Sequence, residues 1–356
     1  MHKLISALLL IHVAGFAQPA AAQTQEIAPE ALRKQALTKT STTVPDGWKV
    51  TAKLGGSINV TDARNVVGAR EGTAIQVGFN LGVQAKYKKG QHTWENVLTI
   101  QEAVQRTPTE GNEPEQFVKS LDNLDLVSTY VYRFSDPDWL GPFAQFKLNT
   151  QIFPTSSETA EPVTIRRTDT NNQTTDQTGQ TVIDQTGAFE PLLLRQTAGI
   201  FGEPYTEDKF TLSFKLGLGA QQIIARGGFN LIDVVVEDDV EVYRLQEIND
   251  TFDFGAEATV AAKGFVIKDV LTWNLSTVAF LPLVTSGDVF AAGSDADSEP
   301  LGTIDRLNLE VAGGLSLKLT KYVSMDWNLL VRRFPQVRDD FQITNTFLVT
   351  LTMDLL

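Results

Sequence analysis

Apolar and polar residues alternate along most of this chain from Trp48 onward. In residues 75–87 every odd position is aliphatic, Ala or aromatic, whereas the even positions are Gln, Gly, Asn and Lys. Residues 307–319 and 341–355 repeat this pattern, and the later stretch ends close to the end of the sequence. Successive side chains of a β-strand point to opposite faces, so each stretch predicts a strand with one apolar and one polar face.

The alternation predicts about twelve strands, many of them longer than the strands of ordinary soluble proteins. Two of them, 92–105 and 189–201, alternate less regularly, so ten or fourteen strands also fit. The expected strands lie at roughly 48–60, 73–88, 92–105, 118–134, 142–153, 189–201, 208–224, 252–264, 268–283, 303–319, 322–334 and 341–355.

Short and long connections alternate between these strands. Residues 88–91, 135–141 and 319–322 are tight turns, whereas 154–188 and 225–251 are long. Bacterial outer-membrane barrels have short periplasmic turns and long outer loops. We therefore expect an all-β fold, a transmembrane antiparallel up-and-down β-barrel of about 12 strands over residues 47–356, in the outer membrane. The alternative is a soluble β-sandwich.

The N-terminal residues differ from the rest. Residues 1–22 combine His2 and Lys3 with an apolar run and an Ala-rich end, which predicts a cleavable secretory signal. Residues 23–46 match no strand, and we expect a periplasmic tail. The chain has no cysteine, and its net charge of −13 argues against nucleic-acid binding, which needs clustered basic residues.

The sequence does not point to an enzyme. Beyond residue 22 it has one histidine, His92, beside a predicted periplasmic turn, and Ser–His chemistry needs a positioned imidazole. We expect no catalytic residues and no cofactor. The loop 225–251 is acidic, and Asp238, Asp239 and Glu241 are candidate ligands for a divalent cation shared with lipopolysaccharide, although their spacing matches no defined cation loop. The other long loop, 154–188, is rich in Thr, Gln, Asn and Asp, so we expect it to be mobile and solvated.

The polar faces predict a charged barrel lumen in which basic residues exceed acidic ones. This arrangement fits a small passive channel for an anionic solute, or a plugged barrel that displays its long outer loops as a structural or surface-interaction protein. Expected partners are the lipid bilayer, lipopolysaccharide and the outer-membrane assembly machinery. The predicted lumen-lining residues are Lys53, Lys86, Asp125, Arg133, Lys147, Arg195, Lys215, Glu257, Arg306, Glu310, Lys318, Asp326 and Arg332.

Three segments resemble a group of uncharacterised bacterial outer-membrane β-barrel proteins, known as a domain of unknown function. The segments are "LGGSIN" (54–59), "YKKGQHTWENVLTI" (87–100) and "FVKSLDNLDLVSTYVYRF" (117–134). The likeness covers roughly residues 48–153 and implies an outer-membrane barrel without a known activity. The positions that carry it are Gly55, Gly56, Lys89, Gly90, Trp94, Asn96, Lys119 and Asp122.

Overall fold

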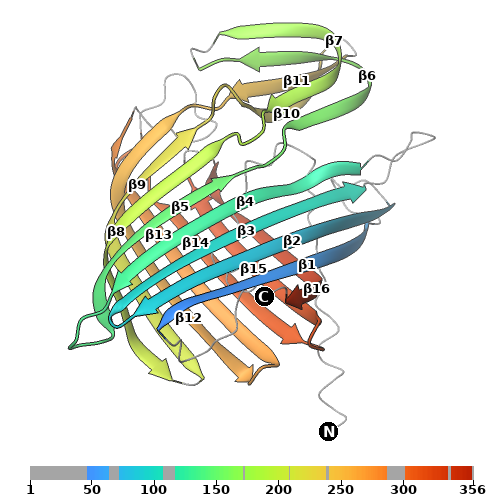
Figure 1. Cartoon of the computed structure of the whole chain (residues 1–356). Helices are drawn as coiled ribbons and strands as arrows, with labels where there is room; N and C mark the ends of the chain where they lie inside the picture. Colours follow the sequence, from blue (N-terminus) through green and yellow to red (C-terminus); the bar gives the residue numbers. More distant parts are fainter. Residues whose placement is uncertain are drawn as a thin grey trace.

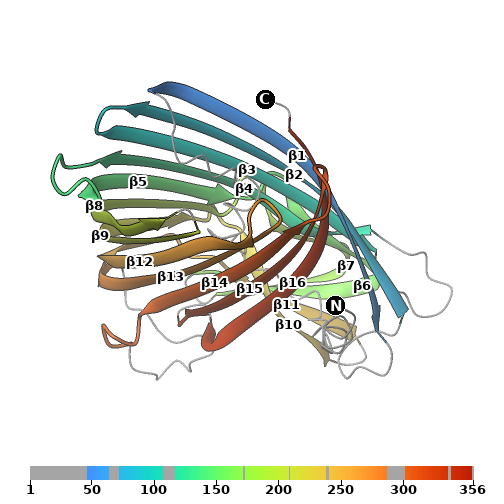
Figure 2. The same ribbon diagram turned by 90° about the horizontal axis from the view of Figure 1, so that it is seen from below.

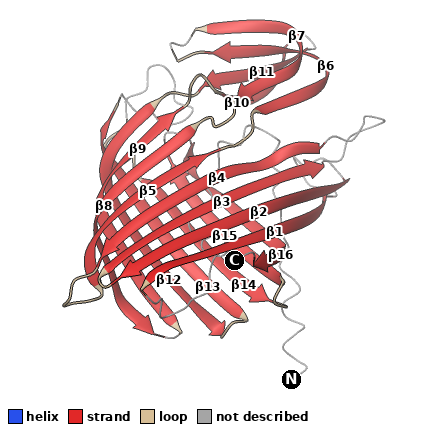
Figure 3. Cartoon of the chain, viewed as in Figure 1, coloured by secondary structure: helices blue, strands red, loops and turns tan. Residues whose placement is uncertain are grey.

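The computed structural model describes residues 46–63, 72–106, 117–170, 173–207, 209–237, 240–286, 301–335 and 338–354. These residues form sixteen strands, and no helix appears among them (Figure 3). In the described part of the chain no helix is long and apolar enough to cross a membrane. The predicted signal at 1–22 and nearly all of the predicted tail lie outside the described residues.

Twelve of the sixteen strands form a closed barrel in the order β1-β16-β15-β14-β13-β12-β9-β8-β5-β4-β3-β2 (Figures 1 and 2). Each pair of neighbours is antiparallel, which confirms the predicted fold class and the count of twelve. The barrel strands are β1 (Gly47–Ala63), β2 (Gly72–Lys89), β3 (His92–Arg106), β4 (Phe117–Tyr132), β5 (Leu140–Thr150), β8 (Leu192–Glu207), β9 (Phe210–Ile224), β12 (Thr251–Ile267), β13 (Leu271–Thr285), β14 (Asn308–Lys318), β15 (Val323–Phe334) and β16 (Arg338–Asp354).

The first and last strands close the barrel over a short seam. Among the described residues, β1 pairs with β16 from Lys53, opposite Asp354, to Ile58, opposite Val349. By contrast, β1 pairs with β2 along its whole length, from Gly47 to Ala63.

Burial in the barrel is the reverse of that in a soluble protein. Large apolar side chains such as Leu216, Val260 and Leu315 are exposed on the outer face, whereas alternate polar residues are buried on the inner face. Lipid takes the place of a protein core around a membrane barrel, and this arrangement suits it. Aromatic side chains, among them Trp48, Trp94 and Tyr205, are exposed near the short turns, where an interfacial belt is expected. The topology and surface are those of an outer-membrane β-barrel.

The two longest connections, 154–188 and 225–251, were predicted as loops, the first of them mobile and solvated, but the structure has β-strands in both. They form a four-stranded sheet in the order β10-β11-β6-β7, beyond the end of the barrel opposite the short turns (Figure 1). Its strands are β6 (Thr155–Thr168), β7 (Thr174–Thr186), β10 (Phe229–Glu237) and β11 (Val240–Glu247). The two hairpins join through a parallel pairing of β11 with β6.

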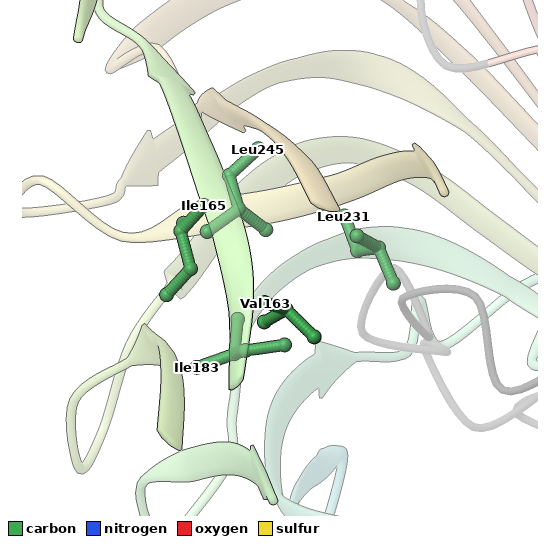
Figure 4. Close-up of a cluster of buried hydrophobic side chains, with 5 residues drawn as sticks. All are labelled: Val163, Ile165, Ile183, Leu231 and Leu245. Carbon is green, nitrogen blue, oxygen red and sulfur yellow. The ribbon is translucent and has the colours of Figure 1, made fainter. Parts of the chain in front are cut away.

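A small apolar core stabilises this sheet. Val163, Ile165, Ile183, Leu231 and Leu245, one or two from each strand, are buried together (Figure 4). Phe229 and Tyr243 pack against them. Burying an aliphatic side chain contributes about 1.5–3 kcal/mol, so even this small cluster orders segments whose other residues are mostly polar.

The burial pattern predicts unequal effects of arginine at two adjacent positions of β14. Leu315 is 42% exposed on the outer face, whereas Ser316 faces inward and hydrogen-bonds to Asp326. Leu315→Arg should lower the free energy of unfolding by about 2–4 kcal/mol, because it places a charge in lipid. Ser316→Arg places the charge beside Asp326 and should cost less. Denaturant unfolding in lipid vesicles measures both, and equal losses would contradict the assigned faces.

Candidate functional site: the inner wall and the neck of the barrel

The inner wall of the barrel is lined by polar side chains that water barely reaches. They come from β3, β4, β5, β8, β12, β14 and β15, so they surround much of the interior. Asp125, Asn123 and Asn149 are each at most 1% exposed, and the Asn149 amide donates to Asn123 at 2.6 Å. Among the described residues, the buried polar side chains of the inner wall are Thr99, Asn123, Asp125, Gln145, Asn149, Thr197, Asp253, Glu257, Thr259, Asn308, Asp326, Asn328 and Arg332.

An ion pair crosses β9 on this inner wall. Arg195 Nε of β8 lies 2.9 Å from Glu257 Oε2 of β12, and Thr197 Oγ1 donates to the same carboxylate oxygen at 2.7 Å. The crossing passes over Gly219 of β9, where an added Cβ would lie 3.4 Å from that oxygen and 3.1 Å from Thr197 Oγ1. Charges with so little contact with solvent need such partners. The glycine of β9, between β8 and β12, leaves room for the two side chains to meet.

Three of the predicted basic lumen residues stack on aromatic rings. The guanidinium carbon of Arg195 lies 4.6 Å from the centre of the Phe280 ring, and that of Arg133 lies 5.0 Å from the Phe201 ring. Lys215 Nζ lies 5.7 Å from the ring of Phe143. All three rings are buried, and Phe143 and Phe201 form a cluster with Val131. These inward rings were not predicted from the sequence. Their positions in the apolar–polar alternation, which are those of the inward-facing residues, could have indicated them.

The remaining predicted lumen residues also occupy inward positions of the strand register, except Arg306, which precedes β14. Asp326 accepts hydrogen bonds from Ser316 and Ser324, and Arg306 donates to Leu301 O and Thr285 Oγ1. Interaction partners also exist for Lys53, Asp125, Lys147, Glu310 and Arg332. Lys86 is half-buried and Lys318 is exposed. A role of these side chains in solute passage stays a prediction.

Four crossovers connect the barrel to the four-stranded sheet, and we call them the neck: residues 151–154, 187–191, 225–228 and 248–250. Asp122 of β4 holds the first of them. Its carboxylate accepts the backbone N–H groups of Ile152 at 2.7 Å and Phe153 at 2.8 Å. Lys119 binds the same carboxylate at 3.0 Å and donates to the carbonyls of Phe153 and Pro154. Lys119 and Asp122, two of the positions that carry the family resemblance, therefore fix the point where the chain leaves the barrel. We call this pair the clasp.

The other crossovers are held in pairs. The side-chain amide of Gln151 donates to Gly187 O at 2.9 Å, and the backbone carbonyl of Gln151 accepts from Phe189 N. These two hydrogen bonds join the first two crossovers. Asp250 accepts from Ala225 N at 2.7 Å, and Ile248 N donates to Gly228 O at 2.8 Å, which joins the other two. Buried or partly buried backbone groups need such partners, so the neck is a built structure rather than a set of free tethers.

An ion-pair network lies on the sheet above the neck. Arg166 binds Asp176 through two nitrogens, each at 2.9 Å, and Glu237 at 2.8 Å. Arg244 also donates to Glu237. The hydrogen bonds from Arg166 lower the pKa of the Asp176 carboxyl, and those from Arg166 and Arg244 lower the pKa of Glu237.

The predicted divalent-cation loop stays a prediction, because most of its candidate ligands are not among the described residues. Asp238 and Asp239 lie outside them, and Glu241 accepts a hydrogen bond from Tyr243. Within the part of the chain that is described, no three His, Cys, Asp or Glu side chains come together in a way that could hold a metal ion.

Comparison with known families gives a partial match. The family described as "Protein of unknown function (DUF3078)" matches residues 68–155, which includes the Lys89–Trp94 turn and the Lys119–Asp122 clasp. The matched range is less than half of the chain and covers β2 to β5, so the similarity is limited to that part. None of the curated proteins matches the chain.

Solved structures with a similar architecture are outer-membrane barrels. An outer membrane channel from Pseudomonas putida F1 is 10% identical, with a TM-score of 0.40 over 87% of this chain and 97% of that one. The translocator domain of the autotransporter NalP from Neisseria meningitidis is 10% identical, with a TM-score of 0.37 over 90% and 91%. The outer membrane channel DcaP of Acinetobacter baumannii is 7% identical, with a TM-score of 0.32 over 89% and 99%. Similarity this distant assigns no function.

The neck predicts a local effect of Asp122→Ala. Two backbone N–H groups and Lys119 lose their shared acceptor, and an unsatisfied buried group costs about 1–3 kcal/mol. Hydrogen exchange should therefore accelerate at the amides of Ile152, Phe153 and Thr155 while the barrel strands stay protected. Asp184→Ala, at an exposed position of β7, is the control. Unchanged exchange in Asp122→Ala would show that the clasp does not order the crossover.

The ion-pair network predicts acid sensitivity of the sheet. Because the folded-state pKa values of Asp176 and Glu237 are lowered, their stabilisation is present above the ordinary carboxyl pKa. It is lost as the pH falls through the lowered values. Hydrogen exchange of β6 and β7, corrected for its intrinsic pH dependence and followed from roughly pH 6 to 3, should show this loss. Arg166→Gln should flatten the profile, and an unaltered profile in that variant would contradict the assignment.

Proposed function

We propose that this protein is an outer-membrane barrel with a closed interior, which holds the four-stranded sheet outside the cell as a surface for contact with other molecules. The observation that carries the proposal is the burial of the inner wall. Polar side chains from both sides of the barrel are nearly inaccessible to water, as in Asp125 at 0%, Asn149 at 1% and Asn308 at 4% exposure. The lining of an open aqueous pore would be wet.

The state of the charged residues supports the same proposal. Arg195 pairs with Glu257, and Arg133 pairs with Glu203, while both guanidinium groups also stack on phenyl rings. Cations held in this way are partly neutralised and immobile. They are less suited to attract a passing anion than the solvated lysines that a basic channel would need.

A small passive channel is the second candidate. Lys318 is exposed and Lys86 is half-buried at inward positions of the turn end, so a vestibule at that end could admit a small anionic solute. The two candidates differ in one measurable property, which is ion conductance.

Conductance of the purified protein in planar bilayers tests the proposal. We expect no stepwise current, even after residues 156–186 are deleted, because the wall side chains themselves fill the interior. A variant with Arg195→Ala, Glu257→Ala and Arg332→Ala should conduct, whereas Leu315→Ala on the lipid face should stay silent. Anion-selective steps in the unaltered protein, reduced when Lys147 and Arg306 are made acidic, would overturn the closed barrel in favour of the channel.

A further inference from the structure

The turn end of β1 to β4 carries two rows of side chains on the outer face of the barrel. Trp48, Tyr87, Trp94 and Tyr130 are opposite one another in successive strands and form the first row. Trp48 is 57% and Trp94 is 42% exposed, and their rings lie 5.7 Å apart. Indole and phenol rings exposed in this way mark the membrane–water interface.

The second row lies two residues nearer the turn and contains Lys89, His92 and Tyr132. Lys89 pairs with His92, and His92 pairs with Tyr132, so the three side chains share the outer face. Two residues of strand span roughly 7 Å, which places this row just on the water side of the aromatic row. Lys89 and His92 are both exposed.

The contacts within these rows orient the histidine. His92 Nδ1 is hydrogen-bonded to Tyr130 Oη at 2.5 Å, and the His92 ring lies 5.1 Å from that of Tyr132. With Nδ1 engaged, Nε2 is the ring nitrogen left to meet another group. The two-residue turn Gly90–Gln91 brings Lys89 opposite His92, and Gly90 adopts a φ of +55° that glycine accepts without strain.

The geometry points to a binding site for the headgroup of an anionic phospholipid in the periplasmic leaflet. The Lys89 ammonium, the His92 ring and the Tyr132 hydroxyl would donate to the phosphate, and Trp48 and Trp94 would contact the first carbons of the acyl chains. The row lies at the level where phosphates occur next to an interfacial aromatic belt. This inference does not depend on the proposed function, because it concerns the opposite end of the barrel from the sheet.

Native mass spectrometry of the purified protein in detergent mixed with phosphatidylglycerol or phosphatidylcholine tests the site. The unaltered protein should retain phosphatidylglycerol in preference to phosphatidylcholine. Lys89→Ala with His92→Ala should reduce that retention about fivefold, as expected for the loss of one exposed ionic contact and one hydrogen bond. Lys88→Ala is the matched control, because Lys88 is the neighbouring lysine of β2 and faces inward.

Equal retention of the two lipids by the unaltered protein would overturn the proposal. So would retention of phosphatidylglycerol that is unchanged in the double variant, or reduced as much in Lys88→Ala. Circular dichroism melting identifies any variant that fails to fold. In that case Lys89→Ala alone, at an exposed turn position, replaces the double variant in the same comparison.

Discussion

A bilayer offers no hydrogen-bond partner to an unpaired backbone group, and this constraint determines the rest of the structure. Every membrane-spanning strand must have neighbours on both sides, so the sheet has to close on itself. In this chain the closure depends on the short seam between β1 and β16, from Lys53 opposite Asp354 to Ile58 opposite Val349. Closure then separates an outer face that meets lipid from an inner face that does not, and the alternating sequence supplies one kind of residue to each.

On the inner face, polar and charged side chains are removed from bulk water and need partners within the protein. Several of these groups pair with one another across the wall. Glu257 receives Arg195 and Thr197 over the glycine of the strand between them. Inward phenylalanines give the cations a second contact that needs no opposite charge. A wall built in this way is held by short-range geometry, and opening it would leave charges without partners.

The barrel was predictable from the sequence because its signal is local and repeated. The predicted strand 252–264 corresponds to β12 (Thr251–Ile267), and 73–88 corresponds to β2 (Gly72–Lys89). The four-stranded sheet was not predictable in this way. β7 is almost entirely polar, and the pairing of β6 with β11 is parallel and joins segments far apart in the chain. Neither feature leaves a periodic pattern, and among the described residues of these strands six buried aliphatic side chains distinguish them from loops.

The candidate site was also predictable only where the signal is local. Inward charges such as Arg195 and Glu257 follow from parity, which assigns a face but not a partner. The stacking of Arg195 on Phe280 and the capture of two backbone N–H groups by Asp122 depend on the register between strands. Register is set by turns and bulges along the whole sheet, so single-sequence periodicity does not contain it.

The position of the sheet connects the wall to the neck. All four crossovers leave from β5, β8, β9 and β12, which are consecutive in the barrel order. The Arg195–Glu257 pair joins β8 to β12 across β9 a few residues inside their outer ends, directly below these crossovers. This ion pair on the inner wall therefore also fixes the spacing of strands that carry the sheet. Any solute path through this part of the wall would require separation of β8 from β12, and with it a displacement of the sheet. The contacts that hold the inner wall together and the position of the outer sheet are thus linked through the same strands.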